Sequence, residues 1–265
     1  TMDYTDEAGR YNSIVMDSNG YIHVVHINGG NYQIRHSIHD GTSWNSVKIK
    51  DCAQTYCWDV HMVIDDNDEL HAAYTTYTSW AETLVYMHYN GTTWTSEEVS
   101  SNALFGPIGI AVDSNNYPHI SYASSGGEQC GDGLRLASYS GSSWTHDNVD
   151  TGDNRGCESA IVIDDNDNIY IAYQNRDESK LKIATDKSGS WDLYSADSGV
   201  SSSSLYPGYM SSMAIDQQGQ LHIAHYDGKE DDLRYSTGAP NGQWTTTIVD
   251  SAGNTGRDPS IALDS

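Results

Sequence analysis

The chain has 265 residues, and its 37 acidic and 13 basic residues give a formal net charge of −24. A surface of that sign repels nucleic-acid phosphates and anionic membranes, which excludes both as partners, and no stretch reaches the apolar length of a membrane-spanning helix. The 19 Tyr and 7 Trp against one Phe indicate thin, half-buried layers in which the ring tips find hydrogen bonds. The acidity fits a soluble extracellular or salt-adapted surface, and it leaves the binding of a divalent cation open.

A short apolar run that ends in aspartate recurs six times along the chain. These marker aspartates are spaced by 48, 48, 51, 52 and 48 residues, and they are Asp17, Asp65, Asp113, Asp164, Asp216 and Asp264. A self-similar unit of this length without a helical period is typical of a β-propeller blade. The sequence therefore predicts an all-β fold, a single β-propeller domain over residues 1–265.

Each repeat is predicted to hold four strands, named a to d. In the first repeat, strand a precedes Asp17, a tight turn follows, and strand b covers Tyr21–His26. Strand c is Gln33–His36, and a second turn leads to Trp44, which opens strand d. The marker turns are rich in Asp, Asn and Gly, which tolerate left-handed backbone conformations. Five full repeats of about 49 residues result, and residues 258–265 begin a sixth; the repeats are approximately 11–58, 59–106, 107–157, 158–209 and 210–257.

The sixth copy of strand a, Ser260–Ser265, has no place in a ring of five blades. The N-terminal segment 3–13 aligns without a gap with 250–260, so the chain starts near the end of a strand d. In one explanation the ring has six or more blades and the chain is an excised part of a longer repeat array. In the other, the extra strand pairs with another molecule, and the protein self-assembles as a subunit of a filament or array. The pattern favours the first explanation.

The turn between strands c and d carries a recognisable motif in two repeats, Ser37-Ile-His-Asp-Gly-Thr-Ser-Trp44 and Thr185-Asp-Lys-Ser-Gly-Ser-Trp191. Both stretches resemble degenerate forms of the Asp-box of sialidase-like (BNR) propellers, Ser-x-Asp-x-Gly-x-x-Trp. The chain as a whole is also similar to lectin-like propellers, including tachylectin-like ones. Sialidase catalysis in that family uses three arginines, a Tyr–Glu pair and an acid Asp. No arginine motif of that type is found, since Arg10 and Arg257 share one repeat position, so the resemblance implies architecture and not the enzymatic activity.

Two sets of repeated polar residues are candidate metal ligands. Four histidines lie six residues after a marker aspartate, and Tyr170 takes that place in the fourth repeat; they are His23, His71, His119 and His222. One such residue per blade is too widely spread to converge on one ion, so we expect each to hydrogen-bond inside its own blade. The marker turns of the second and fourth repeats are oxygen-rich, as Ca²⁺ requires, through Asp65, Asp68, Asp164 and Asp167. Hairpin formation explains these aspartates, and a weak Ca²⁺ site is the alternative.

The five Trp residues that follow the second turn are expected to wedge between blades, whereas Trp58 and Trp80 stand outside the repeat. The loops from strand d to strand a and from strand b to strand c emerge on one face, and they are the longest and least regular. Aromatic and arginine side chains mark recognition surfaces, so we predict ligand binding there by Tyr56, Trp58, Trp80, Arg155, Arg176, Tyr206 and Tyr209.

Four cysteines, an even number in polar loops, favour disulfides and an oxidising compartment. Cys52 and Cys57 share one loop, while Cys130 and Cys157 lie in adjacent loops of the same face, so two bridges are predicted.

No nucleophile elbow, His-Glu-x-x-His or phosphate-binding glycine loop is present. The sequence therefore predicts an extracellular or cell-surface recognition or structural module. It would be non-catalytic, would need no cofactor unless Ca²⁺ binds, and would take a glycan or protein on the loop face. The alternatives are a sialidase-like glycoside hydrolase or lyase, and a subunit of an array.

Overall fold

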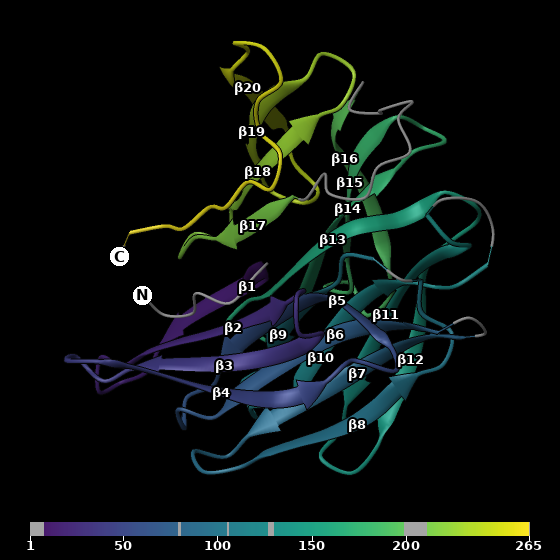
Figure 1. Ribbon diagram of the computed structural model, residues 1–265. Helices are drawn as coiled ribbons and strands as arrows, with labels where there is room; N and C mark the ends of the chain where they lie inside the picture. The colour runs from purple at the N-terminus through teal and green to yellow at the C-terminus, as the bar shows by residue number, and fades with distance from the viewer. Residues whose placement is uncertain (1–7, 79–80, 105, 127–129, 199–210, 265) are drawn as a thin grey trace.

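The chain folds into five four-stranded antiparallel sheets, which lie around one axis in the computed structural model (Figure 1). The structure describes residues 8–78, 81–104, 106–126, 130–198 and 211–264. Every regular element in those ranges is a strand, and none is a helix long and apolar enough to span a membrane. The predicted all-β propeller of four-stranded blades is confirmed.

Each blade is one sheet whose four strands follow the chain from the axis outward. The first blade is β1 (Ala8–Met16), β2 (Ile22–Asn28), β3 (Gln33–His39) and β4 (Trp44–Asp51). The second is β5 (Tyr56–Ile64), β6 (Leu70–Thr78), β7 (Ala81–Tyr89) and β8 (Trp94–Ser100). The third is β9 (Gly109–Val112), β10 (Pro118–Ala123), β11 (Gly133–Tyr139) and β12 (Trp144–Thr151). The fourth is β13 (Arg155–Ile163), β14 (Ile169–Asn175), β15 (Lys180–Thr185) and β16 (Asp192–Ser198). The fifth is β17 (Ser212–Ile215), β18 (Leu221–Asp227), β19 (Asp232–Gly238) and β20 (Trp244–Asp250).

The marker aspartate fixes the first hairpin of every blade. In the second blade, Oδ1 of Asp65 accepts hydrogen bonds from the backbone N–H groups of Asn67 and Glu69, at 2.9 and 2.8 Å. Its Oδ2 lies 3.4 Å from Nε2 of His71. Equivalent contacts recur at Asp17, Asp113 and Asp216, and the Tyr170 hydroxyl replaces the imidazole at Asp164. The prediction that these histidines act locally within their own blades is confirmed.

Four of the five repeat tryptophans, which stand at the start of a fourth strand, join neighbouring blades. Nε1 of Trp94 donates to Nδ1 of His36 in the preceding blade at 3.2 Å, and Nε1 of Trp144 donates to Oε1 of Glu97 at 2.9 Å. Trp191 and Trp244 pack against the apolar clusters shared with the blade before them. These four indoles are therefore wedges between blades, as the sequence predicts, whereas the ring of Trp44 contacts His39 of its own blade.

Three inner strands are longer than their apolar runs predict. β1, β5 and β13 begin several residues early, and each is broken by a bulge before the marker run. Asp59 and Glu158 take left-handed backbone conformations at these bulges, with φ of 53° and 57°, which lets pairing continue across them. Tyr56, Trp58 and Arg155 were predicted in loops, and that placement is wrong because all three lie within these strands.

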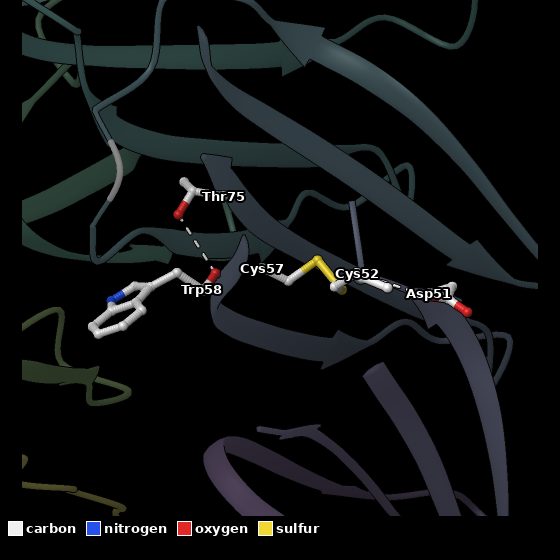
Figure 2. Close-up of a disulfide and its surroundings, with 6 residues drawn as sticks. Asp51, Cys52, Cys57, Trp58 and Thr75 are labelled. Carbon is white, nitrogen blue, oxygen red and sulfur yellow. Dashed lines mark hydrogen bonds between the residues drawn. A yellow bond between two sulfur atoms is a disulfide. The ribbon is translucent and has the colours of Figure 1, made fainter. Parts of the chain in front are cut away.

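The loop that leads into β5 is closed by the predicted Cys52–Cys57 disulfide (Figure 2). Both half-cystines are buried, and the bridge joins the end of the first blade to the inner strand of the second. Cys130 is also buried and disulfide-bonded, while the side chain of its predicted partner Cys157 lies outside those described.

Breaking the small bridge is expected to destabilise the protein modestly. The Cys52→Ser/Cys57→Ser double variant frees a very short loop in the unfolded chain, so its free energy of unfolding should fall by about 2 kcal/mol. Urea unfolding of the oxidised wild type and the variant measures this. Reduced wild type is not a matched control, because reduction would also open the second predicted bridge, Cys130–Cys157. An unchanged unfolding midpoint would contradict a stabilising role for the bridge.

Candidate functional site

A groove of about 500 Å³ runs between the second and third blades. One wall comes from the second blade: its marker turn, strands β6 and β7, and the start of β8. The other wall is the marker turn of the third blade with the end of β11. The groove is lined by Asp65, Asn67, Glu69, His71, Tyr86, His88, Thr95, Ser96, Glu97, Asn115, Asn116, Tyr117, Pro118 and Tyr139. It contains three carboxylates, two imidazoles and three phenols, and none of its lining residues is Lys or Arg.

The polar groups on the floor of the groove are held in fixed protonation states. The Tyr86 hydroxyl lies 2.6 Å from Nδ1 of His71, whose Nε2 faces Asp65. Burial lowers the pKa of His71, with a smaller opposing effect of Asp65, and burial together with nearby Glu97 raises the pKa of Tyr86. Neutral His71 therefore accepts the Tyr86 proton at Nδ1 and donates its own from Nε2 to the carboxylate.

Groups on the rim of the groove retain hydrogen-bonding capacity for a ligand. Glu69 is paired through one oxygen, Oε2, with His88 Nε2 at 2.8 Å, and Glu97 accepts from Trp144 through Oε1. A carboxylate has several lone-pair directions, so each of these groups has acceptor capacity to offer to hydroxyl groups. The rings of Tyr117 and Tyr139 meet edge to face, with centroids 6.1 Å apart, and Tyr117 is partly exposed. The site thus combines acceptors with an exposed aromatic face.

A second cavity, of about 740 Å³, lies on the axis at the end where the inner strands begin. Its wall includes Arg10, Tyr11, Asp59, His61, Glu158 and Asp258. Tyr11, Asp59, Glu158 and Asp258 occupy the same place in their repeats, six residues before the marker aspartate, and all four have left-handed backbones.

The side chains around this axial cavity influence one another electrostatically. Burial and the nearby Asp59 carboxylate raise the pKa of Asp258. Burial, Asp59 and Asp258 also raise the pKa of Tyr11 to about 12. Burial lowers the pKa of His61, but the Asp59 carboxylate, 3.4 Å from Nε2, raises it by more.

Of the seven predicted ligand-binding residues, the four that the structure describes, Tyr56, Trp58, Arg155 and Arg176, line neither cavity. Tyr56 is exposed and its ring meets that of Tyr32 edge to face. The Trp58 ring packs on Tyr11 with centroids 4.4 Å apart, and its side chain points away from the disulfide (Figure 2).

The two predicted arginines form ion pairs. Arg155 pairs with Asp150 at 2.8 Å, and Arg176 with Glu158 at 3.5 Å. Trp80, Tyr206 and Tyr209 lie outside the described residues. Ligand binding by this face stays a prediction.

The candidate Ca²⁺ ligands carry hydrogen bonds of the fold. Asp68 accepts from the backbone N–H and the hydroxyl of Ser18 in the first blade, and Asp167 accepts in the same way from Ser114 in the third. Asp65 and Asp164 hold their own turns. Within the described ranges, no group of three or more His, Cys, Asp or Glu side chains is arranged to hold a metal ion. The oxygen-rich turns thus have an explanation as links between blades.

Sequence reasoning missed the groove between the second and third blades. Its walls come from turns some 50 residues apart, and a single-repeat pattern does not show that they face each other. One signal was available. Tyr117 follows its marker aspartate by four residues in a turn that is otherwise made of Asp, Ser and Asn, and only Tyr21 shares that position.

Comparison with known proteins supports the fold but does not identify a function. No protein-family model matches the chain, and no curated protein does. A protein of unknown function from Dyadobacter fermentans superimposes with a TM-score of 0.69 at 9% identity, covering 98% of this chain and 88% of its own. The Aleuria aurantia lectin, solved with α-methyl-L-fucoside, gives a TM-score of 0.67 at 13% identity, with 94% of this chain and 80% of the lectin covered. The Hadza microbial sialidase Hz136 gives 0.61 at 10% identity, with 92% of this chain and 59% of the sialidase covered. The likeness to lectin and sialidase propellers is therefore confirmed at the level of architecture.

Proposed function

We propose that this protein is a non-catalytic carbohydrate-binding β-propeller that takes a neutral glycan in the groove between its second and third blades. The observation that carries the proposal is the composition of the groove, which joins carboxylate, imidazole and amide groups to tyrosine rings and includes no Lys or Arg. Sugar hydroxyls donate to carboxylates, and the C–H face of a pyranose stacks on an aromatic ring. Ligand sites of this kind combine apolar walls with a few placed polar groups.

The charge of the groove narrows the class of glycan. Glu69, Glu97 and Asp65 give it a negative field, and the chain as a whole carries −24. A sialylated, sulfated or uronic acid-rich chain would be repelled, since opposite charges across an interface give specificity and like charges oppose binding. Neutral sugars such as fucosides, galactosides or N-acetylglucosaminides avoid this repulsion. The disulfide supports an oxidising, extracellular setting in which such glycans occur.

Binding should be abolished or strongly reduced when the exposed ring and the rim acceptor are removed. Titration calorimetry with α-methyl-L-fucoside and with neutral and sialylated oligosaccharides on wild type identifies the ligand. Tyr117→Ala and Glu97→Gln are each expected to weaken it roughly tenfold or more, which is about 1.4 kcal/mol. Glu97→Gln keeps an oxygen for Trp144, so the blade contact survives.

Tyr21→Ala provides the matched control. Tyr21 holds the same repeat position as Tyr117 but lies outside the groove, so this variant should bind like the wild type. If Tyr56→Ala removes binding while Tyr117→Ala does not, the ligand lies on the opposite face and the proposed groove is wrong. Exclusive binding of anionic glycans would also contradict the proposal.

Glycoside hydrolysis at the axial cavity is a second candidate, and the electrostatics of Asp59 and Asp258 favour it. Burial and the neighbouring Asp59 raise the pKa of the Asp258 carboxyl, and two carboxyl groups in different environments are the arrangement that acid and base partners of glycosidases use. Turnover of any aryl glycoside that disappears in Asp59→Asn and in Asp258→Asn would establish the enzyme. No turnover by wild type, together with glycan binding in the groove, would support the lectin.

A further inference from the structure

The turn between β7 and β8 presents an exposed side-chain amide. Asn90 opens this turn, and Asn90, Gly91 and Thr92 are all exposed. Oδ1 of Asn90 accepts hydrogen bonds from the backbone N–H groups of Thr92 and Thr93, at 3.1 and 3.0 Å, and from the Thr92 hydroxyl at 2.8 Å. Its Nδ2 makes no hydrogen bond with the residues that the structure describes. The turn therefore holds the amide by its oxygen and leaves the nitrogen available.

The equivalent turn of the first blade shows that the fold does not need this nitrogen. There Oδ1 of Asp40 accepts from the backbone N–H groups of Thr42 and Ser43, at 2.9 and 2.8 Å, and from the Thr42 hydroxyl at 2.7 Å. The two turns have the same hydrogen bonds, although Asp40 carries a second oxygen where Asn90 carries its nitrogen. The turn is also open, because a Cβ built on Gly91 would meet no atom within 4 Å. A substituent on Nδ2 of Asn90 would therefore cost the turn no contact.

The sequence of this turn is that of an acceptor for N-linked glycosylation. Asn90-Gly-Thr92 is the one Asn-x-Ser/Thr sequence among the 265 residues. The hydroxyl group that such a sequence requires is in place, since Thr92 donates to the carbonyl oxygen of the amide. The repeat itself does not call for this combination, because the other four turns at this place lack either the Asn or the hydroxyl residue: Asp40-Gly-Thr42, Ser140-Gly-Ser142, Ser188-Gly-Ser190 and Asn241-Gly-Gln243.

The compartment that the disulfide indicates is the one in which this modification takes place. The Cys52–Cys57 bridge supports an oxidising, secretory environment, and acceptor sequences are modified on surface turns of secreted proteins. The turn is such a surface turn. Sequence, exposure and compartment thus agree on one chemical role for this side chain.

We propose that Asn90 is an N-glycosylation site, at which Nδ2 takes an oligosaccharide from a lipid-linked diphosphate donor. A bond forms between Nδ2 and the anomeric carbon as the bond from that carbon to the phosphate oxygen breaks. The amide releases one proton, and the lipid diphosphate leaves with the electron pair of the broken bond. His88 and Thr95, on the two strands that flank the turn, line the groove between the second and third blades. The oligosaccharide therefore stands beside the rim of that groove.

The test is secretion of the chain by eukaryotic cells behind a cleavable signal sequence, followed by measurement of the intact mass. Wild type should carry one oligosaccharide, and an amidase that cleaves the bond between Asn and sugar should remove it. Asn90→Asp deletes the acceptor nitrogen and keeps the oxygen that holds the turn, as at Asp40, so this variant should fold and carry no sugar. Thr92→Val should abolish the modification, and Thr92→Ser should retain it.

Asp40→Asn is the matched control, because it completes the same Asn-Gly-Thr sequence in the same turn of the first blade. It should add a second oligosaccharide. Secreted wild type without a sugar at Asn90 would overturn the proposal, and so would a sugar that Asp40→Asn gains only at its new position. Equal modification of Thr92→Val and wild type would overturn it as well, because the hydroxyl contact would then have no part in the reaction.

Discussion

Acidification from pH 7 to pH 4 is expected to destabilise this protein by several kcal/mol, and buried neutral histidines are the cause. Burial, with a contribution from nearby His23, lowers the pKa of His36 from 6.5 to about 3. Nδ1 of His36 accepts the indole proton of Trp94, and its Nε2 lies 3.0 Å from Nδ1 of His23. Protonation at Nδ1 would break the link between the first two blades.

The sign of the effect follows from the two pKa values. Below pH 6.5 His36 is protonated in the unfolded chain, whereas in the folded chain it stays neutral down to about pH 3. The unfolded chain therefore binds more protons between these two values, and unfolding is favoured as the pH falls. Each such group contributes roughly 1.4 kcal/mol for each pH unit. His225 acts in the same direction, because burial lowers its pKa to about 4, with Asp197 opposing and Arg234 reinforcing the shift.

Urea unfolding at pH 7, 6, 5 and 4 measures this slope. His36→Gln should reduce the slope of the unfolding free energy against pH by the amount that corresponds to about one bound proton. His39→Gln, on the same strand, controls for the loss of any histidine. Burial raises the pKa of Asp17, but the hydrogen bonds of its hairpin lower it by more, and hairpin hydrogen bonds also lower the pKa of Asp216. These aspartates lose their contribution to stability only below about pH 4. Equal slopes for wild type and His36→Gln would refute the assignment to this imidazole.

Removal of one marker aspartate is the second large effect. Asp65→Ala leaves the backbone N–H groups of Asn67 and Glu69 without their acceptor and removes the carboxylate beside His71. The loss of charge-assisted hydrogen bonds in a partly buried turn should lower the free energy of unfolding by about 3 kcal/mol. Chemical denaturation of the purified variant measures it.

Two further variants separate the causes. Asp66→Ala, one residue on and exposed, should change stability by less than about 0.5 kcal/mol. Asp65→Asn keeps an oxygen for the turn and loses the charge, so it should fall between the wild type and Asp65→Ala. Similar losses in Asp65→Ala and Asp66→Ala would mean that the marker aspartate does not hold the hairpin.

The repeat made most of the fold predictable. A period near 50 residues, a turn after each marker aspartate and a tryptophan after each second turn define four strands per blade, and the turn position that needs a left-handed backbone is filled by Asp, Asn or Gly, as at Asp68. The histidine contacts followed from the constant six-residue offset. Short-range chemistry of this kind is written into one repeat.

What escaped prediction depends on how different repeats meet. β5 starts early because a bulge at Asp59 lets the strand pairing continue. The spacing of apolar residues does not indicate such a bulge, because its central residue is acidic and has a left-handed backbone. The groove places Glu97 opposite Tyr117 only because the turn of one blade meets the fourth strand of its neighbour. The arginines that suggested recognition, Arg155 and Arg176, form ion pairs with Asp150 and Glu158, and no repeated sequence pattern points to these pairs.

The position of a bound neutral glycan tests the central proposal most directly. A crystal structure of the protein soaked with the tightest neutral ligand from the calorimetric panel should place a sugar ring against Tyr117, with its hydroxyl groups directed to Glu69 and Glu97. A sugar at the axial cavity beside Asp59 and Asp258, or on the opposite face at Tyr56, would contradict the proposal that the groove between the second and third blades is the binding site.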